Sequence, residues 1–128
     1  MGQYFKAVNM DKKEVVCPWC INGGAKFLEW TANRHGAIFT LLLRKSDEYG
    51  GGDIHQPTYE LDSNAICGRW AGDSVVLIGD YDSSELWRLS KLYTNISEPL
   101  VEVWNSLFDD PLDQLKFDRH CSCQDFEL

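Results

Sequence analysis

A short apolar run in the second half of the chain most constrains the fold. Val75-Val76-Leu77-Ile78 stands between Gly72-Asp73 and Gly79-Asp80, so turn residues bound it on both sides. Its β-branched residues favour a strand, and a run that is apolar at every position predicts burial of both strand faces. We therefore expect a central strand over Ser74–Gly79, in a sheet that is covered on both sides.

Alternation of polar and apolar residues, bounded by turn residues, predicts four further strands: Gln3–Val8, Lys13–Cys17, Lys26–Trp30 and Ile66–Trp70. Capping residues and apolar stripes with helical spacing predict three helices: about Arg34–Arg44, about Glu85–Tyr93, and one that begins at Ser97-Glu98-Pro99 and stops before Asp109-Asp110-Pro111. The expected class is α+β, with a mainly antiparallel sheet of about five strands covered by two to three helices.

The length of 128 residues suits one domain over residues 1–128, and an apolar fraction of 44% suffices for a core without disulfides. Residues 46–64 hold three consecutive glycines and form an expected long Gly-rich loop. Residues 109–128 form an expected acidic tail. No stretch has the apolar length of a signal peptide or a membrane span, so we expect a cytoplasmic protein with no membrane partner.

Charge is unevenly distributed along the chain. The net charge is −8, and residues 46–128 carry 5 basic and 17 acidic side chains. A field this negative repels phosphate backbones, so nucleic acid is a disfavoured partner. It favours either a protein partner with a basic surface or solubility alone.

Five cysteines, an odd number, argue against a disulfide scaffold and for thiols or a metal site. Cys17 and Cys20 have the two-residue spacing that lets both thiolates reach one tetrahedral zinc ion, and Cys121, Cys123 and His120 can complete the ligand set. Against zinc, the second spacing is one residue and the two halves lie about a hundred residues apart. A redox dithiol and inert structural thiols stay open as alternatives.

A second candidate site consists of polar groups near the ends of predicted strands. Arg69, Asp73 and Asp80 can bind a carboxylate or phosphate, or form an internal pair that fixes the hairpin. The glycine loop, with Gly51, Gly52 and Asp53, can expose backbone N–H groups to an anion. No catalytic triad can be assembled from the three histidines, so the sequence favours a protein that is not an enzyme.

Several segments occur together in a recognisable order: Met1-Gly2-Gln3-Tyr4, Val8–Glu14, Gly50–Asp53, Gly68-Arg69-Trp70-Ala71-Gly72-Asp73, Gly79-Asp80-Tyr81 and Tyr93–Ser97. As a set they resemble an uncharacterised family of small proteins of bacteriophages and bacteria. The resemblance implies a phage context, and with it a host cytoplasm, but no mechanism. The family does not carry the Cys17–Cys20 pair in this form, which would make a zinc or redox site a feature of this branch.

These observations lead to three hypotheses about function. The first is a small acidic binding protein, a phage-encoded inhibitor or counter-defence factor that occludes a basic surface of its partner. The second is a small-ligand (nucleotide) binding protein or enzyme that works around Arg69, Asp73 and Asp80. The third is a structural domain stabilised by zinc at Cys17, Cys20, Cys121 and Cys123.

Overall fold

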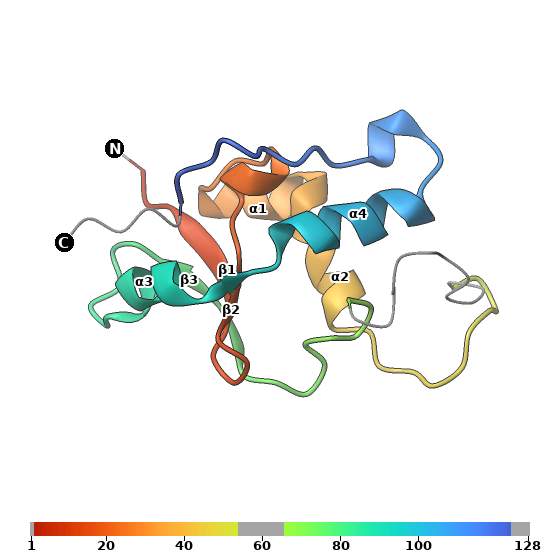
Figure 1. Cartoon of the computed structure of the whole chain (residues 1–128), viewed down its shortest axis with the longest axis horizontal. Coiled ribbons are helices and arrows are strands. Elements are labelled where there is room, and N and C mark those ends of the chain that lie inside the picture. The colour runs from red at the N-terminus through yellow and green to blue at the C-terminus, as the bar shows by residue number, and fades with distance from the viewer. Residues whose placement is uncertain (1, 54–65, 124–128) are drawn as a thin grey trace.

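The computed structural model describes residues 2–53 and 66–123, and within these residues the strands form one four-stranded sheet of order β3-β1-β2-β4 (Figure 1). The strands are β1 (Phe5–Asn9), β2 (Glu14–Val16), β3 (Val75–Gly79) and β4 (Thr94–Asn95). The α-helices of the same residues are α1 (Phe27–Ala32), α2 (Ile38–Leu42), α3 (Leu86–Leu89) and α4 (Ser97–Leu107). The α+β class is confirmed.

Two of the three strand pairings in the described residues are antiparallel, in agreement with the predicted mainly antiparallel sheet, but the third is parallel and the sheet has four strands instead of about five. β1 pairs antiparallel with β2 and β3, but β2 pairs parallel with β4. The parallel pair is held by two backbone bonds, from Thr94 N–H to the Lys13 carbonyl at 3.0 Å and from Ile96 N–H to the Val15 carbonyl at 3.0 Å. A strand of two residues has too few positions for an alternating pattern, which is why the sequence did not predict β4.

The predicted strand Lys26–Trp30 is wrong, because this segment begins helix α1. The Lys26 N–H donates to the Glu29 carboxylate at 2.9 Å, which satisfies a backbone donor that the first helical turn leaves unpaired. Trp30 is the residue that α1 buries, and its indole N–H donates to the Phe5 carbonyl at 3.1 Å. An acidic residue three positions after the helix start was the local signal for this helix.

The predicted hairpin between Ile66–Trp70 and the following strand is also wrong. Residues 66–72 form turns, and the N–H groups of Gly68 and Trp70 donate to the carbonyls of Leu41 and Leu42 at 2.8 and 2.9 Å. Carbonyl groups at the end of α2 thus accept the hydrogen bonds that the prediction assigned to a neighbouring strand.

β3 lies at one edge of the sheet, so the expectation of a central strand is wrong, but its apolar run has a clear cause. Val75 and Leu77 pack on the main core, whereas Val76 and Ile78 pack on a second cluster across the sheet. Both faces of the strand are therefore in apolar contact, as the run predicts. Its backbone pairs with β1, and β1 and β2 are the two strands that have a neighbour on each side.

The predicted helix over Arg34–Arg44 is divided into a 3₁₀ helix, η2 (Arg34–Ala37), and α2. Gly36 approaches the preceding helix so closely that a Cβ would stand 1.7 Å from the Trp30 carbonyl oxygen. The predicted helix over Glu85–Tyr93 is α3 followed by the 3₁₀ helix η4 (Ser90–Leu92), and the predicted third helix is α4.

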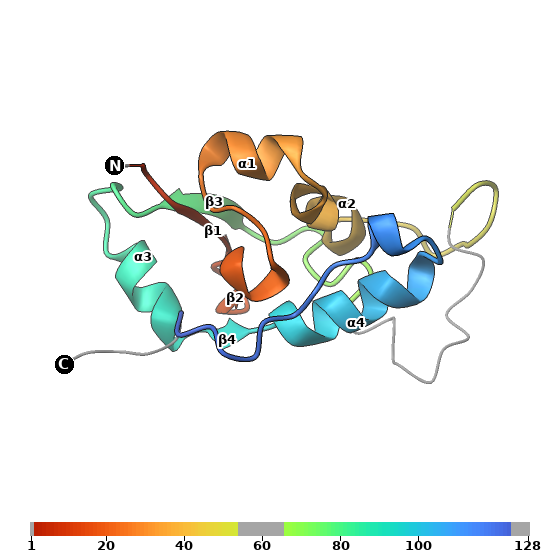
Figure 2. The same ribbon diagram turned by 90° about the horizontal axis from the view of Figure 1, so that it is seen from above.

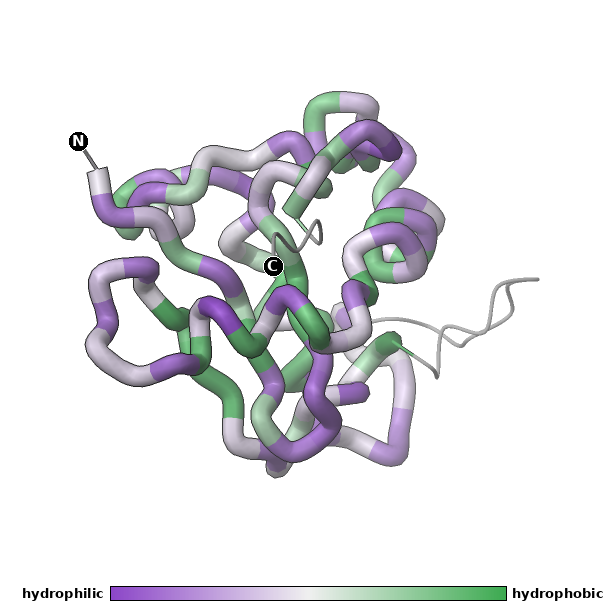
Figure 3. The backbone as a smooth tube through the Cα atoms, turned by 60° about the vertical axis from the view of Figure 1, so that its left-hand side comes forward, coloured by the Kyte–Doolittle hydropathy of each residue, from purple (hydrophilic) through white to green (hydrophobic). Residues whose placement is uncertain are grey.

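Two apolar clusters lie on opposite faces of the sheet. The larger one joins the sheet to α1, α2 and α4 and contains Trp30, Trp70 and Trp104. The smaller one joins Val8, Val15 and Ile78 to the partly buried Trp87 of α3. Figure 2 shows α1 and α3 on opposite sides of the strands, and Figure 3 shows hydrophobic stretches running through the middle of the molecule. None of the helices in the described part of the chain is long and apolar enough to cross a membrane.

The segment after α4 turns back and runs to the sheet, where it ends beside β4 (Figure 2). It contains the 3₁₀ helix η5 (Pro111–Asp113) and then the buried Leu115, whose N–H and carbonyl bond to the side chain of Asn105, each at 2.8 Å. Of the predicted loop 46–64, residues 46–53 contain no helix or strand, and residues 54–64 lie outside the described residues, as do residues 124–128 of the predicted acidic tail.

Candidate metal centre

Cys17 and Cys20 are held by a tight turn that directly follows β2. The 3₁₀ helix η1 (Trp19–Ile21) places both thiols on one side of the turn, and the Gly23 N–H closes it by donating to the Pro18 carbonyl at 2.8 Å. Asn22 ends η1 in the left-handed conformation, with φ of 60°, which asparagine tolerates better than most residues. Both cysteines are buried, with exposed fractions of 1% and 3%.

Cys121 and Cys123 reach this turn from the C-terminal segment. The Asp118 N–H donates to the Cys20 carbonyl at 2.7 Å, and the Asp118 carboxylate accepts the His120 N–H at 2.9 Å. These bonds bend the segment so that Cys121 and Cys123, two residues apart, both face the turn. His120, which the sequence analysis considered as a ligand, is exposed and is not part of the sulfur group.

The four sulfur atoms lie close enough together to share one metal ion. All four lie within 4.8 Å of one another, with 3.8 Å between Cys17 and Cys121 and 3.4 Å between Cys20 and Cys123. Four sulfurs at about 2.3 Å from a tetrahedral zinc ion stand roughly 3.8 Å apart. The arrangement therefore fits a metal with four thiolate ligands and no further protein donor.

Two polar residues that the sequence analysis missed surround the sulfurs. The Asn95 side-chain amide donates to Cys20 Sγ at 3.4 Å and to Cys123 Sγ at 3.6 Å. Its oxygen accepts both the N–H and the hydroxyl of the buried Ser97, at 2.9 and 2.5 Å, so the NH₂ group must face the sulfurs. Ser97 Oγ in turn accepts the Cys17 N–H at 3.1 Å. Such outer contacts orient metal ligands in proteins, but nothing in the local sequence around Asn95 signals this role.

Neighbouring thiols shift one another's pKa in opposite directions. Hydrogen bonds from Cys123 and Cys17, with a further one from Asn95, lower the pKa of Cys20. The pKa of Cys17 is raised, because its thiol donates within the cluster and is buried. Contact among the thiols thus makes Cys20 easier to deprotonate than Cys17.

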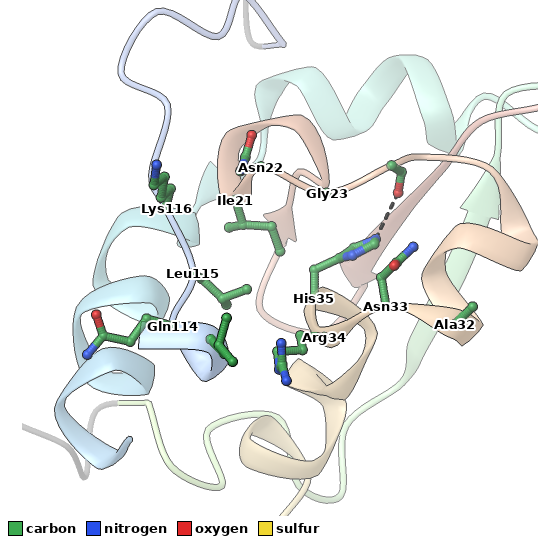
Figure 4. A pocket seen from close by; sticks show the side chains of 12 residues that line it. Ile21, Asn22, Gly23, Ala32, Asn33, Arg34, His35, Gln114, Leu115 and Lys116 are labelled. Carbon is green, nitrogen blue, oxygen red and sulfur yellow. Dashed lines mark hydrogen bonds between the residues drawn. The ribbon is translucent and has the colours of Figure 1, made fainter. Parts of the chain in front are cut away.

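A pocket of about 660 Å³ lies next to the centre, between residues 21–24, residues 32–35 and the C-terminal segment at residues 112–116 (Figure 4). The buried His35 lines it, and its Nε2 lies 2.8 Å from the Gly24 carbonyl. A carbonyl only accepts, so this nitrogen carries a proton, and burial lowers the pKa of His35 and favours its neutral form. One wall of the pocket belongs to the same segment that carries Cys121 and Cys123.

The second candidate site of the sequence analysis is assembled only in part, because Arg69 and Asp73 lie at one end of β3 and Asp80 lies at the other. Arg69 bonds the buried Glu14 carboxylate, and Asp73 accepts from Lys12 and from Asn9. Asp80 accepts the Tyr4 N–H at 2.9 Å, at the other end of β3. The length of that strand, roughly 14 Å at about 3.4 Å per residue, separates Asp80 from Asp73.

The residues of the predicted glycine nest lie in the segment that follows α2. Asp53 is bound by the Arg44 guanidinium, whose Nε lies 2.9 Å from one carboxylate oxygen. Gly51 and Gly52 have φ of 65° and 91°, and an added Cβ at either would meet nothing within 4 Å. Cys67 packs against the main core and is not part of the sulfur group.

Comparison of the chain with models of protein families, with curated proteins and with solved structures finds no match. Functional inference therefore depends on the geometry of the site.

Oxidation of the metal-free protein provides a first prediction. Each of the sulfur pairs at 3.4 and 3.8 Å joins one cysteine of the C-terminal segment to one cysteine of the turn after β2. We expect hydrogen peroxide to form Cys20–Cys123 and Cys17–Cys121 disulfides, each losing two hydrogens as the peroxide becomes two waters. Peptide mapping by mass spectrometry identifies the pairs, and a dominant Cys17–Cys20 disulfide would contradict the arrangement.

Proposed function

We propose that the chain is a structural metal-binding domain in which Cys17, Cys20, Cys121 and Cys123 hold one zinc ion. The observation that carries this proposal is that four sulfurs from two distant parts of the chain lie within 4.8 Å of one another. When bound, zinc supplies four bonds that fasten the C-terminal segment to the sheet, and no redox or acid–base chemistry is assigned to it.

The ligand set favours zinc in a structural role. Four thiolates complete a tetrahedron and leave no position for water or substrate, whereas catalytic zinc sites keep one position open. Soft sulfur ligands select against magnesium and calcium. The turn at Cys17–Cys20 also differs from a redox dithiol, because η1 is followed by the left-handed Asn22 and not by an α-helix that begins at the motif.

The test is metal analysis of protein that is purified under reducing conditions without added zinc. We expect about one zinc per chain, because four thiolates in this geometry bind zinc far more tightly than buffer components do. The cobalt-substituted protein should show the ligand-to-metal absorption of tetrahedral thiolate coordination. Each of Cys17→Ser, Cys20→Ser, Cys121→Ser and Cys123→Ser should lower the zinc content.

Cys67→Ser is the matched control, because it removes the one cysteine that lies outside the sulfur group. It should retain the zinc content and the cobalt spectrum of the wild type. A wild-type protein that carries well below one metal per chain, even after reduction and incubation with zinc, would contradict the proposal.

Two of the sequence-based hypotheses, an inhibitor that occludes a basic partner surface and a nucleotide binder, stay predictions. Salt-dependent retention of a host protein and thermal-shift screening with nucleotides test them separately.

A further inference from the structure

Strand β3 has one edge that pairs with no other strand in the described residues. On its other edge the Ser74 carbonyl accepts the Met10 N–H at 2.9 Å, and every second residue that follows faces β1 in the same way. The N–H and C=O groups of Val75 and Leu77 therefore point away from β1. Within the described part of the chain these groups are hydrogen-bonded to nothing at that edge.

The sequence of β3 does not protect this edge against a further strand. Sheet edges are usually guarded by a charged residue, a proline or a bulge. β3 contains neither a charged residue nor a proline, and its five residues pair with β1 in continuous register. Val75, Val76 and Leu77 are only half-buried, so an added strand would cover further apolar surface. Such an edge can accept an extended segment of another protein.

A mostly apolar cavity of about 340 Å³ opens next to Leu77. Leu77 forms one wall, and residues of α1, η2 and α2, among them Trp30, Thr31 and Phe39, form the others. Side chains that are directly opposite on neighbouring strands lie on the same face of a sheet. The residue that pairs with Leu77 in an added strand would therefore direct its side chain to the face on which the cavity opens. An apolar side chain suits that position.

Carboxylates stand at both ends of β3. At one end the Asp11 carboxylate accepts the Ser74 N–H at 2.7 Å and Asp73 pairs with Lys12, and Asp80 follows the other end. Within the described residues, Asp11 and Asp80 form no ion pair. Basic residues at both ends of an added segment would complement these charges. A second copy of the chain, with its net charge of −8, would bring like charges together instead.

We propose that β3 is a docking edge for an extended protein segment that has an apolar residue at its centre and a basic residue at each end. The segment adds a strand antiparallel to β3, bonds the backbone of Val75 and Leu77, and directs its central side chain into the cavity. Parallel addition would be less stable per residue. The proposal does not depend on metal binding, because Cys17, Cys20, Cys121 and Cys123 neither belong to β3 nor line the cavity.

The probe is the peptide Lys-Val-Thr-Leu-Thr-Val-Lys, acetylated and amidated so that its ends carry no further charge. Opposite Leu77, its central leucine directs N–H and C=O to β3, whereas each threonine directs them away. N-methylation of the leucine should weaken binding at least about tenfold, and N-methylation of one threonine less than about threefold. Exchange of both lysines for glutamate should also weaken binding at least about tenfold. Fluorescence anisotropy of the labelled peptide measures the affinity.

Two variants of the protein test the cavity. Thr31 is an exposed residue of the cavity wall, and its hydroxyl donates to the Leu28 carbonyl at 2.9 Å. Thr40 is exposed too and donates to the Ala37 carbonyl at 2.6 Å, but it does not line the cavity. Thr31→Phe should fill the cavity and weaken peptide binding at least about fivefold, whereas Thr40→Phe should change it less than about twofold. Urea unfolding verifies that both variants fold.

Hydrogen exchange identifies the edge at which the peptide binds. The amides of Val75 and Leu77 should exchange quickly in the free protein and slow down when the peptide is added. The proposal is overturned if the peptide does not bind at millimolar concentration, or if the two N-methylated peptides lose the same affinity. It is also overturned if sedimentation shows a dimer that already protects these amides, because a second copy is then the occupant. The metal content is unaffected by any of these results, so the proposed function stands or falls separately.

Discussion

Removal of the metal from the loaded protein should lower the melting temperature by about 12 to 20 °C. In the proposed centre the metal would join residues that are 104 positions apart, and closing a loop of this length contributes about 4 to 5 kcal/mol in the chain-entropy model. A domain of this size shifts by about 3 to 4 °C per kcal/mol. The measurement is thermal unfolding under reducing conditions, with and without a strong chelator.

Removal of the metal should loosen the C-terminal segment before it destabilises the whole domain. Residues 113–115 keep contacts that do not involve the metal, since the Trp104 indole donates to the Asp113 carbonyl at 2.7 Å and Asn105 bonds Leu115. Residues 116–123 are fastened by the packing of Phe117 on the main core, by an exposed ion pair of Arg119 with Glu98, by the Asp118–Cys20 bond and by the sulfur cluster, and the last of these is the contact that the metal would strengthen. Hydrogen exchange should therefore speed up first at residues 116–123. Equal protection of these amides with and without chelator would contradict a structural metal.

Glu14→Ala should lower the free energy of unfolding by about 3 to 5 kcal/mol, the second large effect that we expect. Glu14 is buried and accepts from the Arg69 guanidinium at 2.6 Å and from the buried Trp70 indole at 2.9 Å. Its removal leaves both donors without their acceptor in a region of low dielectric constant. Urea unfolding at neutral pH measures the effect, and Glu85→Ala, at an exposed pair with Arg88, should cost less than about 1 kcal/mol.

The pH dependence of the Glu14 contribution follows from its pKa. Burial alone would raise that pKa, but hydrogen bonds from Arg69 and Trp70 and the Arg69 charge outweigh it, so the pKa lies below the ordinary 4.5. The stabilisation is therefore fully present above pH 4.5 and is lost as the pH falls through the lowered pKa. The stability difference between wild type and Glu14→Gln should shrink in acid, and a difference that grows instead would show the opposite sign of coupling.

The fold could be predicted from the sequence where the local pattern and the final packing agree. The hairpin of β1 and β2 and the helix α4 have clear periodicity and turn or start signals, and both are present. The errors arose where a tertiary partner decided the outcome. Residues 66–70 satisfy their backbone through the end of α2, and β4 exists because β2 presents a free edge to it.

The candidate site could be predicted only in part. The spacing of Cys17 and Cys20 indicated one half, and Cys121 and Cys123 were its candidate complement. Their convergence depends on a bond between Asp118 and Cys20, which no spacing rule contains.

The order in which the four cysteines are synthesised would give the proposed metal centre one more property. Cys17 and Cys20 leave the ribosome early, and the polypeptide must grow by about a hundred residues before Cys121 and Cys123 follow. A nascent chain arrested between the two pairs carries only half of the sulfur ligands. Firm retention of the ion would thus distinguish chains that have been translated through residue 123 from fragments that stop before residue 121.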